Sequence, residues 1–255
     1  MTPGGHEGVS GVTFDSDGHR LLGVLYLARG GRPKPTALLL HGCPGIEQNG
    51  DLAVALRDHG WNALVFHYRG CWGSAGRYDL RTIPRDVAAA VGYLQAGQHP
   101  SVDPGRLAVI GHSLGGWAAI VAAATDQRLR AVAVCGAAVD LASLELSPAE
   151  IERELTRFLA AEPDAFARQR DDVAGRLRPL DLVGSIAPRP LLIVHGSDDE
   201  WIPLAQARWL RARAGQPCRY AEVDGANHSF SWHRGPLREL IVGWLDQTGI
   251  RGGAQ

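Results

Sequence analysis

Short, largely apolar runs recur along the chain, and segments with helical spacing of apolar residues separate most of them. The runs that predict strands are 37–40, 62–66, 107–110, 129–134, 190–194 and 219–223. Helical patterns cover 52–59, 83–94, 117–124 and 236–246. The run 37–40 is apolar throughout, as expected of a strand that helices cover on both faces. Strands alternating with helices predict an α/β fold with a mainly parallel, doubly wound sheet.

Two further predicted strands, 12–14 and 21–27, precede these runs and bring the sheet to about eight strands. The residues between them include Asp15-Ser16-Asp17-Gly18, and Asp-Gly is a signal for a tight hairpin turn. We therefore expect a short antiparallel edge where the chain enters the sheet.

One long segment, 141–182, interrupts the alternation of strands and helices. It contains no convincing strand and is rich in Arg, Asp and Glu. Ser147 and Pro148 fit the cap and the first position of a helix, and a second helix is predicted over 164–177. A solvated connection would explain this composition, but a long connection inside a compact domain usually has a function. We expect a small helical cap over the reactive loops, inserted in a single domain over 1–255.

The turn after the predicted strand 107–110 carries the clearest chemical signal. Its residues, Gly-His-Ser-Leu-Gly at 111–115, fit the pattern G-x-S-x-G, and an alanine-rich helical pattern follows. In this setting a strand passes sharply into a helix and holds the central serine in strained backbone geometry with its Oγ exposed. Side chains at the flanking glycines would collide across so tight a turn. Ser113 is therefore the candidate nucleophile.

Composition and charge narrow the class of protein. A formal net charge of −1 argues against a general nucleic-acid surface, which needs a clustered basic excess. No apolar run approaches the roughly 18 residues of a membrane span, and the N-terminus lacks a signal-peptide layout. The four cysteines are scattered without a CxxC pair, which favours reduced thiols. We expect a cytoplasmic monomer or homodimer with no nucleic-acid or membrane partner.

A serine hydroxyl is a poor nucleophile until a base takes its proton, and the base needs an acid to orient it. Reactive loops gather at the carboxyl ends of the strands in a doubly wound sheet, so both partners should follow later strands. Asp198 and Asp199 follow the predicted strand 190–194, and His228 and His233 follow the predicted strand 219–223. The chain order Ser, Asp, His is that of α/β-hydrolases.

From His41 to His228 the chain resembles an α/β-hydrolase of the dienelactone hydrolase and prolyl oligopeptidase-like esterase branch. The resemblance rests on Asp-Pro-Gly-Arg at 103–106, Gly-His-Ser-Leu-Gly-Gly at 111–116, His-Gly-Ser-Asp-Asp-Glu-Trp-Ile-Pro at 195–203 and Gly-Ala-Asn-His at 225–228. Those families place the acid in an H-G-x-x-D-x-x-[VI]-P setting, which implies Asp199, with Asp198 one residue out of register. Their base lies in a glycine-containing loop beyond the last strand, which implies His228 rather than His233.

An oxyanion hole needs two backbone N–H groups aimed at the developing negative charge. The residue after the nucleophile, Leu114, supplies one of them in this fold. The loop 41–45 is expected to supply the other; Pro44 has no N–H, and the resemblance implies Cys43. No H-E-x-x-H or other close histidine pairing occurs in the sequence, and we expect neither a metal nor an organic cofactor.

Aromatic residues beside these loops are candidate walls for an apolar acyl or aryl group, although Trp117 and Trp201 fit core packing or loop sealing equally well. The candidates are Tyr68, Trp72, Trp117, Trp201 and Trp232. We also expect His41 to brace the loop 41–45, His112 to pack beneath the serine turn and Arg69 to hold its own loop.

Hydrolysis of a small-molecule ester through an acyl-enzyme is the main functional hypothesis. A peptidase or amidase would use the same residues, although prolyl oligopeptidases carry a large propeller domain for which this length leaves no room. An acyltransferase would pass the acyl group to another alcohol, amine or thiol instead of water. A non-catalytic binding protein on this fold would be expected to have lost one of Ser113, Asp199 and His228, and all three are present.

Overall fold

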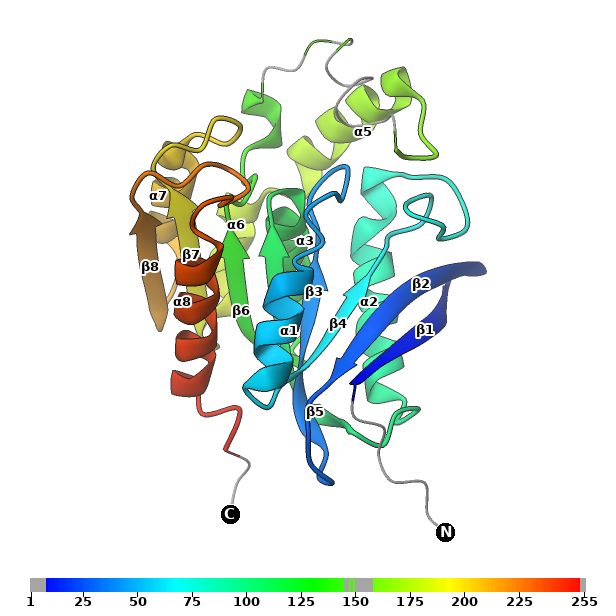
Figure 1. Ribbon diagram of the computed structural model, residues 1–255. Coiled ribbons are helices and arrows are strands. Elements are labelled where there is room, and N and C mark those ends of the chain that lie inside the picture. The colour runs from blue at the N-terminus through cyan, green and yellow to red at the C-terminus, as the bar shows by residue number, and fades with distance from the viewer. Residues whose placement is uncertain (1–7, 145–146, 148, 150–157, 253–255) are drawn as a thin grey trace.

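The computed structural model describes residues 8–144, 147, 149 and 158–252 of the chain. Within them, eight strands form one sheet in the order β1-β2-β4-β3-β5-β6-β7-β8 (Figure 1). The strands are β1 (Gly8–Ser16), β2 (His19–Leu27), β3 (Lys34–Leu40), β4 (Asn62–Phe66), β5 (Val102–His112), β6 (Leu129–Cys135), β7 (Leu191–Gly196) and β8 (Cys218–Val223). β2 pairs antiparallel with β1 and with β4, and all other neighbours pair parallel. The mainly parallel α/β sheet predicted from the sequence is confirmed.

Helices cover both faces of this sheet. The helices of the described residues are α1 (Gly50–Asp58), α2 (Ile83–Gln95), α3 (Leu114–Thr125), α5 (Pro163–Arg176), α6 (Pro179–Leu182), α7 (Leu204–Arg213) and α8 (Arg234–Gln247), with the 3-10 helices η1 (Leu80–Thr82), η2 (Leu141–Ser143) and η4 (Val183–Ile186). α1 and α8 pack on one face, in front of the sheet in Figure 1, and α2, α3 and α7 pack on the other. Over the described residues, no helix has both the length and the apolar character needed to cross a bilayer.

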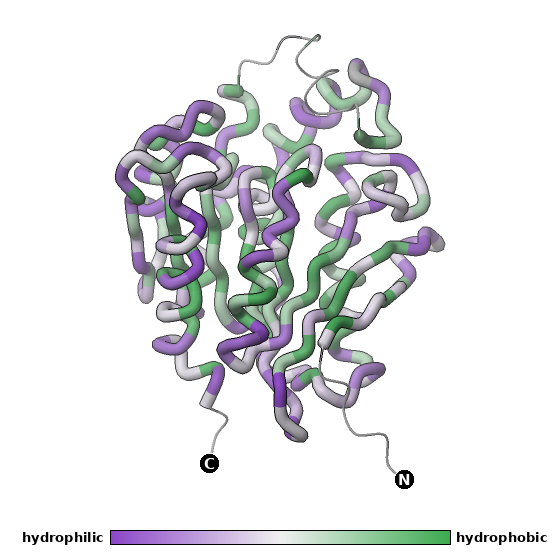
Figure 2. The backbone as a smooth tube through the Cα atoms, in the orientation of Figure 1, coloured by the Kyte–Doolittle hydropathy of each residue, from purple (hydrophilic) through white to green (hydrophobic). Residues whose placement is uncertain are grey.

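The sheet separates two hydrophobic cores, and β3 contributes to both. Successive side chains of a strand point to opposite faces. Leu38 and Leu40 accordingly pack with α2 and α3, whereas Ala37 and Leu39 pack with α1 and α8. This double burial explains why the run 37–40 is apolar at every position, and the central strands are coloured as apolar in Figure 2 for the same reason.

The predicted antiparallel edge is the β1–β2 hairpin. Ser16 pairs with His19, so the connection consists of Asp17 and Gly18 alone. Both have positive φ, 51° and 80°, as a two-residue hairpin turn with the twist of the strands requires. β1 begins at Gly8, earlier than the predicted 12–14, because paired backbone continues beyond the apolar positions.

The segment 141–182 contains one helix where the sequence predicts it, since α5 covers Pro163–Arg176 against the predicted 164–177. Pro148 lies outside the described residues, so the helix start predicted at Ser147 and Pro148 is not described. The sequence pattern does not predict α7, because arginines interrupt it and its buried side chains are few: Gln206, Ala207 and Leu210.

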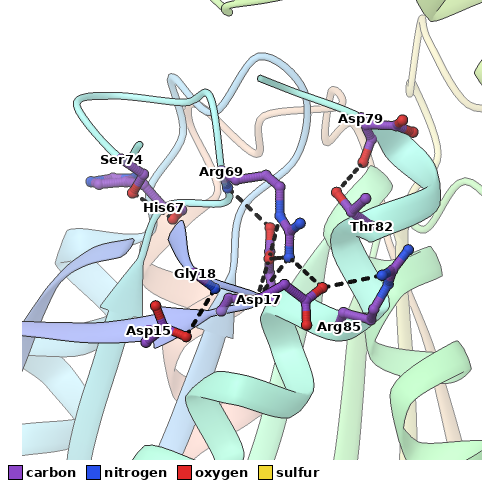
Figure 3. A network of polar contacts seen from close by, with 11 residues as sticks. Asp15, Asp17, Gly18, His67, Arg69, Ser74, Asp79, Thr82 and Arg85 are labelled. Atoms are coloured by element: carbon purple, nitrogen blue, oxygen red, sulfur yellow. Dashed lines mark hydrogen bonds and ion pairs between the residues drawn. The ribbon is translucent and has the colours of Figure 1, made fainter. Parts of the chain in front are cut away.

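A buried ion pair ties the loop after β4 to the hairpin and to α2 (Figure 3). The carboxylate of Asp86, fully buried on α2, accepts hydrogen bonds from Arg69 N at 3.0 Å and Arg69 Nε at 2.8 Å. Arg69 Nη2 also donates to Ser16 Oγ at 2.8 Å and Asp17 Oδ2 at 3.2 Å. The prediction that Arg69 holds its own loop is confirmed, because these contacts attach the loop 67–78 to α2 and to the β1–β2 hairpin.

Candidate active site

Ser113 lies in the turn between β5 and α3 with φ of 57° and ψ of −122°. A residue other than glycine rarely adopts this backbone geometry, which persists only where the surrounding structure enforces it. A Cβ at Gly115 would collide with the carbonyl of Leu40, and a Cβ at Gly111 would collide with the carbonyl of Gly115. The two glycines therefore permit the close approach of β3 and α3 that holds Ser113 in place. The strand, turn and helix predicted around Ser113 are confirmed.

The loop 41–45, which follows β3, passes directly beside Ser113. A Cβ on Gly42 would stand 2.8 Å from the Cβ and 3.3 Å from the Oγ of Ser113. Cys43 and Leu114 both line the cavity described below, and within the described part of the chain neither backbone N–H has an acceptor. Leu114 is the first residue of α3, where a helix leaves its amides unpaired. Among the described residues, two amides without acceptors therefore belong to residues that line the same cavity as Ser113.

The carboxylate of Asp199 and the imidazole of His228 meet at the ends of β7 and β8. His228 Nδ1 lies 2.8 Å from Asp199 Oδ2 and 3.0 Å from Oδ1. Asp199 Oδ1 also accepts the backbone N–H groups of Trp201 at 3.0 Å and Ile202 at 2.7 Å. Burial pushes the pKa of Asp199 upward, but the hydrogen bonds and the nearby imidazoles outweigh it, so the net pKa is lowered. Asp199 is therefore a charged, oriented acceptor for the imidazole.

The two other candidates for acid and base lie apart from this pair. Asp198 is exposed and accepts a hydrogen bond from Ser197 Oγ at 2.9 Å. His233 immediately precedes α8, and the Asp199 carboxylate contacts His228 and His195 instead.

A cavity of about 760 Å³ lies where these loops meet, at the carboxyl ends of the strands. Ser113, His228, Cys43 and Leu114 all line it. Its apolar lining consists of Pro44, Ile46, Leu80, Ala138, Leu141, Leu144, Phe166, Trp201, Ile202 and Pro203, and its charged lining of Glu47, Arg170 and Glu200. A largely apolar cavity with a few convergent polar groups is typical of a small-molecule site.

Of the aromatic residues predicted to contact a substrate, Trp201 alone lines this cavity. The prediction for Tyr68 is wrong: its side chain is 1% exposed, and its hydroxyl donates to the carbonyl of His41 at 3.2 Å. Trp72 donates to the carbonyl of Pro44 at 2.8 Å and supports the loop from outside the cavity. Trp232 is 92% exposed and lies outside the lining. Sequence position places these side chains near the loops but leaves their direction open.

Trp117 belongs to the core. It is fully buried, and its indole N–H donates to the carbonyl of Leu177 at 2.9 Å. Several lining residues were not predicted individually, among them Leu141, Leu144 and Phe166. The expectation that 141–182 covers the reactive loops was the only signal for them.

Three buried histidines at the ends of β3, β5 and β7 each contact a backbone carbonyl of a reactive loop. The contacts are His41 Nδ1 to Gly42 O at 2.7 Å, His112 Nε2 to His228 O at 2.8 Å and His195 Nε2 to Ile202 O at 2.9 Å. A carbonyl only accepts, so each of these nitrogens carries a proton. Burial lowers the pKa of all three, to about 4 for His41 and His112. The expected bracing of the loop by His41 and burial of His112 beneath the turn are confirmed.

The described residues contain no group of three or more His, Cys, Asp or Glu side chains arranged to hold a metal ion.

The fold and this site together define an α/β hydrolase. The model of the prolyl oligopeptidase family (Peptidase_S9) matches residues 53–248, and the chain belongs to that family. An uncharacterized protein of Mycobacterium tuberculosis, Rv2307c, is 31% identical over 219 residues, covering 86% of this chain and 71% of that protein. The quorum-quenching protein AidA of Acinetobacter baumannii is 32% identical over 127 residues, covering 48% of this chain and 41% of AidA.

Solved structures share the fold. Est1E of Butyrivibrio proteoclasticus, solved with ferulic acid bound, superposes with a TM-score of 0.77 at 20% identity, covering 93% of this chain and 98% of Est1E. The esterase domain of a Rhodothermus marinus protein superposes with a TM-score of 0.70 at 24% identity, covering 94% of this chain and 98% of that domain. These likenesses agree with the α/β-hydrolase resemblance in the sequence.

Proposed function

We propose that the protein is a serine hydrolase that cleaves carboxylic esters of small molecules through an acyl-enzyme. The observation that carries this proposal is the pairing of His228 with Asp199 at a cavity that Ser113 also lines. Ser113 is the nucleophile, His228 the general base and Asp199 the orienting acid. The esterase domain of the Rhodothermus marinus protein, which has the same fold, is consistent with this assignment.

The hydrogen bond to Asp199 sets the proton positions. Because His228 Nδ1 donates to a charged carboxylate, the neutral imidazole leaves Nε2 bare, and Nε2 is the atom that must accept the Ser113 proton. Ser113 Oγ then attacks the ester carbonyl. The protonated imidazole returns the proton to the departing alcohol, and a water molecule releases the acyl group by the same route.

The amides of Cys43 and Leu114 would receive the oxyanion of the tetrahedral intermediate. Both lack an acceptor among the described residues, so they are available without breaking another bond. Preorganised donors of this kind lower the barrier by roughly 3 kcal/mol each. The hydrolysis requires no organic cofactor.

Among the described residues, Ser113 Oγ does not hydrogen-bond to His228. Catalytic hydrogen bonds are often long without substrate and shorten in the Michaelis complex. We propose that substrate binding brings these two side chains within hydrogen-bond distance, since both border the same cavity.

We propose that the described part of the segment 141–182, chiefly residues 141–144 and 158–182, caps this site. Leu141, Leu144, Phe166 and Arg170 lie in this segment and border the same cavity as Ser113. The cap would close one side of the cavity around an apolar acyl or aryl group.

The test compares p-nitrophenyl esters of increasing acyl length with aminoacyl p-nitroanilides, using Ser113→Ala as the control. We expect ester cleavage that depends on Ser113 and exceeds anilide cleavage. Faster cleavage of anilides would assign the site to a peptidase or amidase instead. Product analysis with added alcohols, amines and thiols detects an acyltransferase, which would transfer the acyl group in preference to hydrolysis.

A further inference from the structure

The main chain of His228 is held at both of its polar groups. Its N–H donates to Glu200 Oε2 at 3.0 Å, and its carbonyl accepts from His112 Nε2 at 2.8 Å. The ring Nδ1 is occupied by Asp199 at 2.8 Å. Three of the four polar groups of this residue therefore have fixed partners, and Nε2 is the group left for Ser113.

The two residues that contact the main chain of His228 are the sequence neighbours of Ser113 and Asp199. His112 is bonded to Ser113 in the chain, and Glu200 is bonded to Asp199. The base is thus anchored to the nucleophile turn on one side and to the acid loop on the other. A shift of either loop would carry the main chain of His228 with it.

His112 contacts the main chain of His228 through a single hydrogen-bond donor, its Nε2–H. The side chain is buried, with only 3% of the residue exposed, and its ring packs against the His228 ring with centroids 4.9 Å apart and planes at 40°. Because Nε2 carries the proton, Nδ1 is the unprotonated nitrogen, and it has no partner among the described residues. Among the described residues, the contact of Nε2 with the His228 carbonyl is therefore the one hydrogen bond that this side chain makes.

We propose that His112 and Glu200 are positioning residues that hold the His228 imidazole at the angle and depth needed to take the Ser113 proton. This inference rests on the proposed function. Neither side chain takes part in proton transfer itself. A misplacement of about 1 Å in a reacting group costs about 100-fold in rate, so a clamp on the main chain of the base has a large effect.

Paired variants separate the hydrogen bond from the bulk of each side chain. His112→Leu keeps a similar volume without a donor, whereas His112→Gln keeps an N–H donor at the end of the side chain. Glu200→Ala removes the acceptor at an exposed position, and Glu200→Gln keeps an acceptor oxygen without the charge. Val87→Ala, in the core on α2, is the control for destabilisation alone.

The measurements are kcat, KM and the rate at which a fluorophosphonate labels Ser113, each normalised to folded protein. We expect His112→Leu to lower kcat and the labelling rate about 10- to 100-fold, with KM within about threefold. His112→Gln should recover most of that loss. Glu200→Ala should lower kcat and the labelling rate about tenfold, and Glu200→Gln should restore most of both rates. Val87→Ala should retain the wild-type rates per folded molecule.

Two results would overturn the inference: rates of His112→Leu that match those of Val87→Ala, or rates of His112→Gln as low as those of His112→Leu. If His112→Leu does not fold, the Glu200 pair decides, and equal rates for Glu200→Ala and the wild type contradict the clamp. Labelling of the wild type keeps the two proposals apart. A wild-type protein labelled at Ser113, with both variant pairs unaffected, refutes the clamp alone, whereas a wild type that is not labelled refutes the hydrolase assignment.

Discussion

The imidazole of His228 donates to the carboxylate of Asp199 at 2.8 Å, although the two residues follow different strands, β7 and β8. Parallel pairing of β7 with β8 brings the two strand ends together, with Gly196 opposite Val223. The backbone N–H groups of Trp201 and Ile202 then turn the carboxylate toward the ring. The pairing of β7 with β8 therefore brings Asp199 close to His228, and the loop after β7 orients the carboxylate toward the ring.

Asp199→Asn should lower kcat by about 10⁴-fold, because an amide in this place favours the wrong tautomer of the base. Asp198→Asn, one residue away and exposed, should stay within about twofold of wild type. Steady-state ester hydrolysis by the two variants checks this. Equal, mild losses in both would mean that neither carboxylate orients His228.

Cys43→Ser should retain activity within about twofold, because Cys43 is expected to act through its backbone N–H, which the substitution preserves. Burial raises the pKa of the Cys43 thiol to about 12, so the thiol stays protonated near neutral pH. Ester hydrolysis and inhibition by iodoacetamide are the measurements. A loss of activity beyond tenfold in Cys43→Ser would show that the thiol itself takes part in the reaction.

Gly42→Ala should lower activity by about 100-fold or more, because the new Cβ would lie 2.8 Å from the Cβ of Ser113 and displace either the serine or the loop. Gly92→Ala on α2 is the matched control, since a Cβ there meets nothing within 4 Å. The control should leave activity unchanged and stabilise the fold by up to about 1 kcal/mol. Wild-type turnover by Gly42→Ala would show that the loop is free to move away from Ser113.

Acid should destabilise the fold well before its carboxylates are protonated. Burial lowers the pKa of His41 and His112 to about 4, below the ordinary 6.5, so the unfolded chain binds more protons between these values. The free energy of unfolding should therefore fall as the pH drops from 6.5 toward 4, by about 2 kcal/mol for each histidine by pH 5. Urea unfolding at a series of pH values measures this. His41→Gln should reduce the slope, and a flat profile between pH 7 and pH 5 would refute the neutral, buried state.

Several parts of the fold could be predicted because one physical constraint fixes each of them. A strand buried on both faces must be apolar, which is why 37–40 marks β3. The serine turn needs Gly111 and Gly115 for close backbone approach, so the pattern G-x-S-x-G identifies the turn in the sequence. α7 has no such constraint, because arginines occupy its exposed positions and its apolar face is narrow.

The sequence was sufficient to propose the reactive residues, but it did not show which side chains line the cavity or hold the reactive residues in place. Ser113 and the Asp199–His228 pair follow strand ends, where reactive loops gather in this fold. Tyr68 also follows a strand, β4, yet it turns into the core, because side-chain direction depends on packing between loops. The contacts of His112 and Glu200 with the main chain of His228 join residues that are distant in sequence, so no local pattern announces them.

The most direct test of the proposed mechanism is to locate the nucleophile. The protein is incubated with a fluorophosphonate, digested, and the modified peptide is mapped by mass spectrometry, with Ser113→Ala treated in parallel. A single phosphonyl adduct on Ser113, lost in Ser113→Ala together with ester hydrolysis, is the predicted result. Labelling or hydrolysis that persists in Ser113→Ala would contradict it.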